Sequence, residues 1–194
     1  MEDKRIIKTK RNIKDTLIRL LAREPFEKIS VAELCREGVI SRITFYTHYD
    51  SKYALLREMF ADYIGEAYDN YHALQAKNNP RLDGFLGYEN LLECILSLYF
   101  DHYDFFSHTT AGENPYLFSE FFNHVLSSTD DYLARHRSLI ARYPARQTAA
   151  LICNGLFGVI NVCANEHMAE AELRRLARDM YTDLLRSGLF IQQA

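Results

Sequence analysis

Apolar residues recur with a helical period along every long segment of this chain. In residues 5–23, for example, Ile13, Leu17 and Leu20 fall on one helical face and basic residues lie elsewhere. The 194 residues include only 8 Gly and 4 Pro, which disfavours a fold of many hairpins and loops. We therefore predict an all-α protein of about nine helices with no convincing strand.

Capping residues and helix breakers divide the chain into these helices. Pro25 ends the first helix, Gly38 ends a short helix that Ser30 caps, and Ser41 and Ser51 begin the next two. Glu33 completes a capping box with Ser30. The expected ranges are 5–23, 31–37, 42–47, 52–76, 86–101, 104–108, 115–137, 145–165 and 169–187.

The net charge of −3 hides an uneven distribution along the chain. Residues 1–60 hold 13 Lys and Arg against 9 Asp and Glu, whereas residues 61–194 hold 10 against 17. A basic end on an acidic body suggests that the end meets a polyanion. The charged N-terminus lacks the apolar core of a signal peptide, and no apolar run is long enough to span a membrane. We expect a cytoplasmic protein without a membrane partner.

Cysteine and histidine positions give little support to an enzyme. Cys35, Cys94, Cys153 and Cys163 lie far apart without CxxC spacing, so we expect buried, reduced thiols. The sequence contains no HExxH pattern and no glycine-rich phosphate loop. We expect no metal, no cofactor and no catalytic site.

The most informative stretch is ISVAELCREGVISRITFYTHYDSK, which begins at Ile29. Two short helices separated by a glycine-containing turn and preceded by a longer helix form a helix-turn-helix. The second helix of such a motif enters the major groove and presents its N-terminal side chains to base edges. The small core that fixes the angle between the two helices would consist of Val31, Leu34, Cys35, Ile40 and Phe45.

The run from Ser30 to Leu56, with its Thr-Phe-Tyr-x-His-aromatic-x-x-Lys-x-x-Leu-Leu string, resembles the DNA-binding domain of TetR/AcrR-family transcriptional regulators. The resemblance covers residues 5–64, and the rest is similar only in the number and length of its helices. It implies a helix-turn-helix head at residues 1–50 and a helical effector-binding and dimerisation body at residues 51–194. The long connecting helix would span about residues 52–76.

The resemblance also implies roles for single residues of the head. Arg42 and Ile43 would face bases, Tyr46 would reach base and phosphate, and Ser30 with Val31 would present a helix N-terminus to the DNA backbone. Thr44, His48 and Lys52 would contact phosphates, and Ser41 would cap the second helix.

Two departures from the family pattern affect how the operator is read. The family usually has glycine where this chain has Val39, one position after Gly38, and a small residue where it has Ile43. Ile43 could contact a thymine methyl group instead. Alternatively, Tyr46 and His48 could simply pack the head against the long helix, whereas Phe45 and Tyr49 are assigned mainly to the core of the head.

Aromatic residues gather between positions 99 and 124, in the part of the body where the resemblance implies a ligand cavity. Ordinary core packing remains the alternative for each of them. The candidate pocket residues are His102, Tyr103, Phe106, Tyr116, Phe121, Phe122, Cys153 and Phe157. We expect a small, largely apolar or aromatic effector.

The last two expected helices carry apolar residues on more than one face, which indicates an interface in addition to a core. Gly155 and Gly158 would permit close approach of a second copy. The candidate interface residues are Ile152, Leu156, Val159, Ile160, Cys163, Leu173, Met180 and Leu184. A homodimer would bind a palindromic double-stranded operator; a monomeric bundle is the alternative.

These features favour a sequence-specific DNA-binding regulator, a repressor that its effector releases from the operator. One rival is a DNA-binding regulator without a small-molecule effector, controlled by a protein partner. A second rival is a helical enzyme or carrier with a vestigial head. His102 between Asp101 and Asp104 is the nearest approach to a catalytic group, and sequence neighbours do not face each other on a helix.

Overall fold

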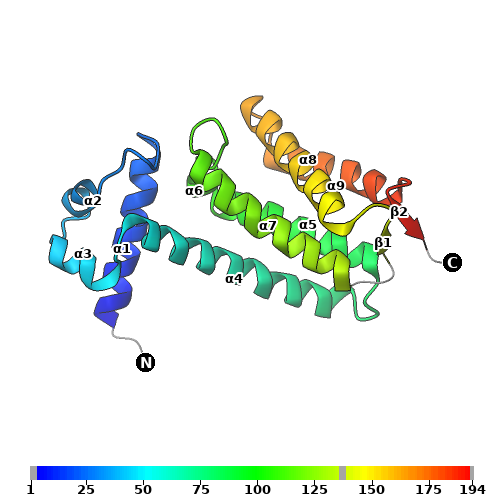
Figure 1. Ribbon diagram of the computed structural model, residues 1–194, viewed down its shortest axis with the longest axis horizontal. Helices are drawn as coiled ribbons and strands as arrows, with labels where there is room; N and C mark the ends of the chain where they lie inside the picture. Colours follow the sequence, from blue (N-terminus) through cyan, green and yellow to red (C-terminus); the bar gives the residue numbers. More distant parts are fainter. Residues whose placement is uncertain (1–3, 136–138, 193–194) are drawn as a thin grey trace. The chain divides into compact units, whose positions relative to one another are not determined.

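A computed structural model describes residues 4–135 and 139–192. These residues contain nine helices and two three-residue strands (Figure 1). The helices are α1 (Lys4–Leu21), α2 (Val31–Glu37), α3 (Arg42–His48), α4 (Lys52–Asn78), α5 (Gly84–Asp101), α6 (Tyr103–Phe106), α7 (Pro115–Arg135), α8 (Ala145–Asn165) and α9 (Glu170–Arg186). The all-α prediction is confirmed; residues 136 and 137, where we expected the seventh helix to end, lie outside the described residues.

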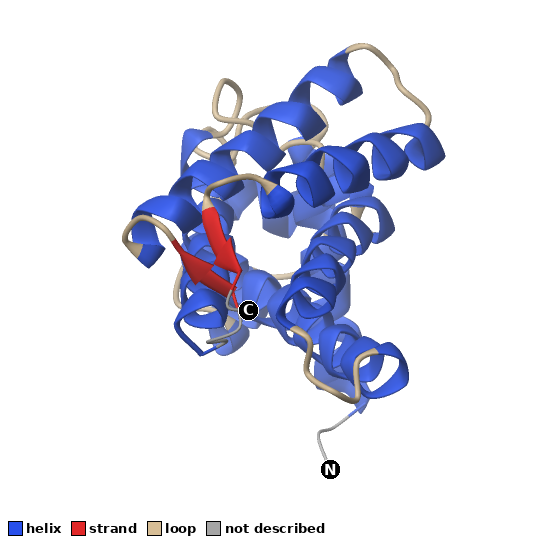
Figure 2. Cartoon of the chain, turned by 90° about the vertical axis from the view of Figure 1, so that its right-hand side faces the viewer, coloured by secondary structure: helices blue, strands red, loops and turns tan. Residues whose placement is uncertain are grey.

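Two three-residue strands, which the sequence did not indicate, pair near the end of the chain. Strand β1 (Leu139–Ala141) runs antiparallel to β2 (Phe190–Gln192), with Ile140 opposite Ile191 (Figure 2). A three-residue run is too short to display an alternating pattern. The two strands are also about fifty residues apart in sequence, so local periodicity carries no signal of their pairing.

The chain divides into two compact units, each with its own core. The first contains residues 1–65 and 102–119, and the second contains residues 66–101 and 120–194. The boundary between the two compact units therefore lies within α4, after residue 65. The sequence instead suggested a functional boundary at residue 50, just before that helix. The boundary at residue 50 stays a prediction about which residues bind DNA.

In the first unit, the core formed by α1, α2 and α3 includes Ile13, Leu17, Leu34 and Phe45, all buried. The segment 102–119 joins this unit through Asn114, which lies at the end of the loop before α7. Its Oδ1 accepts a hydrogen bond from the Phe26 N–H at 2.6 Å, and its Nδ2 donates to the His108 carbonyl at 2.8 Å. The Tyr116 ring stacks on the Phe26 ring with 5.9 Å between centroids. The connector between α1 and α2 is thus tied to the start of α7.

In the second unit, α9 packs against both α5 and α8. Tyr181 on α9 donates a hydrogen bond to the Ile152 carbonyl of α8 at 2.5 Å. By length and composition α8 is apolar enough to cross a membrane. Its apolar residues divide between the core, as at Leu156, and an exposed stripe, as at Leu151.

Candidate DNA-binding site

The two helices of the motif begin at the serines that the sequence predicts. Ser30 Oγ accepts a hydrogen bond from the Glu33 N–H at 3.2 Å, and Ser41 Oγ accepts one from the Thr44 N–H at 3.0 Å. Each bond satisfies one of the backbone donors left open at a helix start. These caps fix the N-terminus of α3, the end that a helix-turn-helix presents to DNA.

The core between α2 and α3 contains the predicted residues, with graded burial. Leu34, Cys35 and Phe45 are buried, whereas Val31 and Ile40 are half-buried. Tyr49, assigned to the core from the sequence, is buried as well, and its hydroxyl donates to Glu58 Oε1 at 3.0 Å. The buried inner side of α3 therefore sets its angle to α2.

The turn between these helices places strain on Val39. Gly38 caps α2 with an ordinary φ of −82°, whereas Val39 has φ of 52° and is 90% exposed. A β-branched residue is rarely found in the left-handed region, which glycine enters freely. The position at which the family pattern has glycine therefore needs a glycine-like conformation, and valine adopts it here.

Substitution Val39→Gly is expected to stabilise the protein. Relief of the left-handed strain, less the larger unfolded-state entropy of glycine, gives a net gain of about 1 kcal/mol. Thermal unfolding would show a rise of roughly 2–4 °C. Gly38→Ala is the matched comparison and should destabilise, because a Cβ there would lie 2.9 Å from the Leu34 carbonyl oxygen. An unchanged or lower melting temperature for Val39→Gly would contradict the conclusion that the left-handed conformation of Val39 destabilises the protein.

The outer face of α3 exposes the side chains expected to contact bases. Arg42 is exposed, Ile43 is 81% exposed and Tyr46 is 54% exposed. In the described part of the chain, Arg42 takes part in no ion pair. The rings of Tyr46 and Phe45 pack edge-on, with 5.5 Å between their centroids. This contact holds the Tyr46 side chain in place while much of its surface faces solvent. Exposed apolar residues on a capped helix indicate a surface that binds a partner.

Two further residues expected to contact phosphate lie partly within the head. Thr44 is half-buried, and its hydroxyl lies 2.9 Å from that of Ser41. His48 is half-buried beside Tyr49, with 6.5 Å between ring centroids. Whether His48 contacts phosphate or packs the head against the long helix α4 stays a prediction.

The structure gives Lys52 a different task from the predicted phosphate contact. Its Nζ donates hydrogen bonds to the carbonyls of Phe26, Glu27 and Ile29 at 2.8, 2.9 and 2.8 Å. An ammonium group has three protons, so these bonds use them all. Partial burial lowers the pKa of Lys52, and the charges of Glu27 and Glu24 oppose that effect. In this structure Lys52 is a positioning residue that joins α4 to the connector before α2.

Glu58 on α4 neutralises part of the basic charge that the sequence assigned to the head. Its carboxylate lies 2.9 Å from Lys10 Nζ and 2.7 Å from Lys14 Nζ, and Lys14 also binds Asp62 at 2.6 Å. Partial burial alone would raise the pKa of Glu58. The hydrogen bonds from Lys14, Lys10 and Tyr49 outweigh burial and lower the pKa from 4.5 to about 2. This cluster was missed in the sequence because Glu58 lies 44 and 48 residues after the lysines that it binds.

The lowered pKa of Glu58 predicts acid sensitivity. A carboxylate with a depressed folded-state pKa contributes stability above its ordinary value near 4.5, which is lost as pH falls toward about 2. After allowance for solvent screening we expect about 1–2 kcal/mol. Glu58→Gln should lose this amount at pH 7 and match the parent near pH 2, as followed by urea unfolding. Asp15→Asn, whose partner Arg11 is 3.9 Å away and exposed, should change little. A pH-independent deficit for Glu58→Gln would count against this assignment.

The eight candidate pocket residues divide equally between the two compact units. His102, Tyr103, Phe106 and Tyr116 belong to the first unit; Phe121, Phe122, Cys153 and Phe157 belong to the second. Most pack on neighbours within their own unit: Phe121 and Phe122 lie 5.2 and 5.9 Å from Phe157 between ring centroids. Their role in a ligand pocket stays a prediction.

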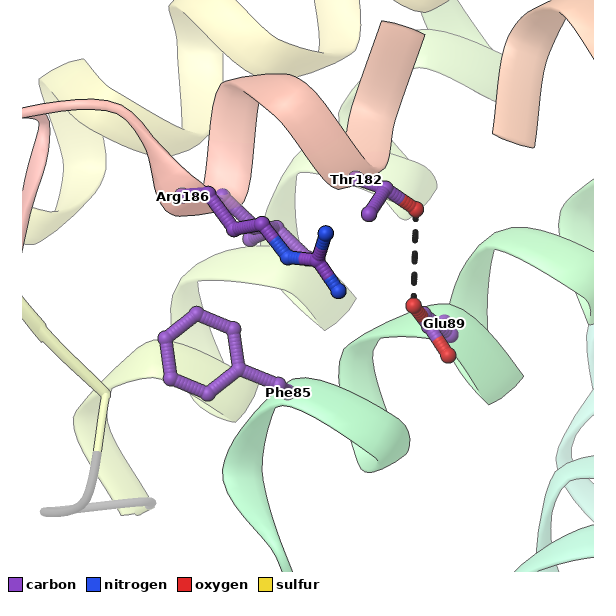
Figure 3. A pocket seen from close by; sticks show the side chains of 5 residues that line it. Phe85, Glu89, Thr182 and Arg186 are labelled. Carbon is purple, nitrogen blue, oxygen red and sulfur yellow. Dashed lines mark hydrogen bonds between the residues drawn. The ribbon is translucent and has the colours of Figure 1, made fainter. Parts of the chain in front are cut away.

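A cavity of about 230 Å³ lies elsewhere, between α5 and α9 (Figure 3). It is lined by Phe85, Glu89, Thr182, Leu185 and Arg186. None of the eight candidate pocket residues lines it. No group of His, Cys, Asp or Glu in residues 4–135 and 139–192 is arranged to hold a metal ion.

All four cysteines are buried free thiols, as the sequence predicts. Burial raises the pKa of each of them, to about 11 for Cys94. The nearby Arg42 charge partly offsets burial at Cys35. A thiol with a raised pKa is a poor nucleophile at neutral pH, so these side chains pack rather than react.

The candidate dimer residues mostly belong to the core of the single chain. Five of the eight, Ile152, Leu156, Ile160, Cys163 and Leu173, are buried; Val159 and Leu184 are half-buried and Met180 is 48% exposed. Assigning the buried five to an interface was wrong, because each of these helices has two apolar faces and the sequence does not say which one the monomer buries.

The exposed apolar face of these helices consists of other residues. Leu151 and Val162 on α8 are 58% and 54% exposed, and Leu176 and Met180 on α9 are 36% and 48% exposed. A Cβ on Gly155 or Gly158 would have no neighbour within 4 Å. We name this set, Leu151, Gly155, Gly158, Val162, Leu176 and Met180, the α8–α9 face.

A capped, exposed second helix on a three-helix head is the geometry of a helix-turn-helix, a motif that binds DNA. Residues 13–59 match the family described as bacterial regulatory proteins, tetR family. This match covers α2, α3 and parts of α1 and α4, so the head is similar to the DNA-binding part of that family. A search of curated proteins found no match.

Solved structures of this class share the fold over nearly the whole chain. A putative tetR-family regulator from Shewanella sp. PV-4 has a TM-score of 0.69 at 17% identity, over 95% of this chain and 99% of that one. A TetR regulator from Streptococcus agalactiae 2603V has 0.59 at 20%, over 92% and 96%. Thermus thermophilus FadR, a TetR-family repressor in complex with lauroyl-CoA, has 0.61 at 15%, over 95% and 97%.

Proposed function

We propose that this chain is a cytoplasmic repressor that binds a palindromic operator as a homodimer and is released by a small, largely apolar or aromatic effector. The observation that carries the DNA-binding part is the capped α3 with Arg42, Ile43 and Tyr46 exposed at its outer face. Arg42 would donate two hydrogen bonds to a guanine, and Ile43 would contact a thymine methyl group.

Phosphate contacts would fix the register of α3 on the duplex. Ser30 and Val31 would present the N-terminus of α2 to the DNA backbone, while Thr44 and His48 would contribute side-chain donors. Ser41 would act through its cap on α3. Lys52 would contribute by holding the connector between α1 and α2 rather than by touching DNA.

Dimerisation through the α8–α9 face would place two heads on the two halves of the operator. Four large apolar side chains exposed on two adjacent helices favour a partner surface, and the two glycines allow close helix approach. In such a dimer, Val159 and Leu184 would lie at the margin of the contact.

Effector control would work as a shift between two populations of the dimer. The link between Asn114 and the Phe26 N–H supports such a path, because it joins the start of α7 to the connector that Lys52 also holds. The lauroyl-CoA that Thermus FadR binds makes long-chain acyl compounds one class to test.

A second function, a regulator controlled by a protein partner without an effector, has one observation in its favour. Candidate pocket aromatics pack closely on other rings, as Phe121 does on Phe157 and Phe106 does on Tyr63. Aromatic rings that fill their own space leave less room for a ligand.

The test is binding to the DNA upstream of the chain's own gene, compared with an unrelated duplex at fixed salt because phosphate contacts make affinity salt-dependent. Specific binding of two protomers per palindrome would support the proposal. Lauroyl-CoA and flat aromatic compounds would then be screened for those that both stabilise the protein and release the DNA. Failure of every compound would favour control by a protein partner, and loss of all binding preference would reject the regulator.

A further inference from the structure

Facing side chains of α5 and α9 meet at intervals of about one helical turn, in an order that shows the helices to be antiparallel. Glu93 on α5 binds Arg174 at 2.8 Å and Arg178 at 2.9 Å on α9. One turn further along, the Thr182 hydroxyl lies 3.4 Å from Glu89 Oε1. The series continues to Phe85 and Arg186, which line the cavity together with Glu89, Thr182 and Leu185 (Figure 3).

The series contains no ion pair at the cavity. There, Glu89 and Arg186 lie at successive contacts of the series, about one helical turn apart, and carry opposite charges. Glu89 faces the Thr182 hydroxyl instead of a cation. Arg186 lies across from the Phe85 ring, whereas Arg178 has a carboxylate at the corresponding place. Within residues 4–135 and 139–192, neither Glu89 nor Arg186 takes part in an ion pair. The cavity thus presents one anion and one cation beside apolar surface.

We infer that this cavity binds an α-amino acid with an apolar side chain. The guanidinium of Arg186 binds the ligand carboxylate, since its planar donors match a carboxylate in pairs. The Glu89 carboxylate and the Thr182 oxygen accept hydrogen bonds from the ligand ammonium, which has three protons to donate. The ligand side chain lies against Phe85 and Leu185.

Size and position fit a small ligand that acts apart from DNA contacts and dimerisation. The volume of about 230 Å³ is below the roughly 300–1,000 Å³ of sites for drug-sized ligands, so the cavity suits a molecule of amino-acid size. On α9, Thr182 and Arg186 lie roughly 120° around the helix from Leu176 and Met180. The site therefore remains open when the α8–α9 face is covered.

The experiment is calorimetric titration of the full chain, without DNA, with L-leucine and L-phenylalanine. We expect dissociation constants of about 0.1–1 mM, since few atoms are bound and the site is partly open. The controls are 4-methylpentanoate, which lacks the ammonium of leucine, and 3-methylbutylamine, which lacks its carboxylate. Each should bind at least tenfold more weakly. No binding of either amino acid at 10 mM, or equal binding of the single-charge analogues, would overturn the inference.

Variants locate the binding on these residues. Glu89→Gln and Arg186→Gln should each weaken L-leucine binding at least tenfold, with circular dichroism confirming that both variants are folded. Arg175→Gln, which removes an exposed α9 arginine outside the cavity, should bind as the parent does. Unchanged binding by Glu89→Gln and Arg186→Gln would overturn the assignment of the ligand site to this cavity. Because no DNA is present, this result is independent of whether the proposed regulatory function holds.

Discussion

Arg42→Ala is expected to weaken operator binding by about 1–3 kcal/mol per half-site, roughly 5- to 150-fold, and to relax base preference at one position. Arg42 stands at the start of α3, is exposed, and makes no ion pair within the described residues that would give it a structural task. A side chain in that place can form two parallel hydrogen bonds to guanine O6 and N7. Lysine cannot reproduce both bonds, so Arg42→Lys should recover affinity only in part.

The measurement is fluorescence anisotropy at one salt concentration, with the operator and a set of single-base variants. Arg11→Ala removes the same charge from the same compact unit and serves as the control. It should lower affinity by a similar factor for all duplexes, since general charge attraction carries no sequence information. Equal discrimination among bases by Arg42→Ala and the parent protein would exclude Arg42 from base recognition.

The local features of the head were predictable because their causes lie within a few residues. Ser30 and Ser41 each accept a hydrogen bond from the N–H three positions later, so a serine at the right spacing was a sufficient signal. The same holds for Ser51, whose Oγ accepts from the Ala54 N–H at 3.2 Å. Helix type followed from periodicity, and the nine described helices agree with the expected ranges to within a few residues.

The roles of charged side chains were harder to predict, because their partners are distant in sequence. Lys52 binds carbonyls 23 to 26 residues earlier, and Glu58 binds lysines 44 and 48 residues earlier. A basic residue in a DNA-binding pattern suggests a phosphate contact, unless acceptors within the fold accept all of its hydrogen bonds. Only the packing of α4 on α1 and on the connector reveals those acceptors.

Apolar residues with a helical period were recognised, but the helix face that the monomer buries was not. Leu156 and Val162 both fit an interface stripe on α8, yet Leu156 is 1% exposed and Val162 is 54% exposed. Periodicity defines a stripe and leaves open whether α5, α7 or a second copy covers it. The aromatic cluster poses the same difficulty, since Phe121 and Phe157 pack on each other as well as fitting a ligand pocket.

Leu151→Glu is expected to separate the proposed homodimer and, with it, to abolish tight operator binding. In the monomer Leu151 is 58% exposed, so a carboxylate there costs the folded chain little. In the proposed dimer each copy would bury that charge without a partner, which costs at least about 3 kcal/mol or more than 100-fold in the dimer dissociation constant. Sedimentation equilibrium would show monomer at concentrations where the parent is dimeric, while circular dichroism shows that the monomer keeps the helical content of the parent.

Two comparisons separate loss of the interface from loss of the fold. Ser127→Glu adds the same charge at an exposed position of α7 and should leave the dimer intact. Leu156→Ala removes a buried side chain from the opposite part of α8 and should lower the stability of the fold by about 2–5 kcal/mol. A dimer of unchanged affinity in Leu151→Glu would place the contact elsewhere than the α8–α9 face. A Leu151→Glu monomer that still binds the operator as tightly as the parent would break the link between dimerisation and DNA recognition, because a single head contacts only one half-site.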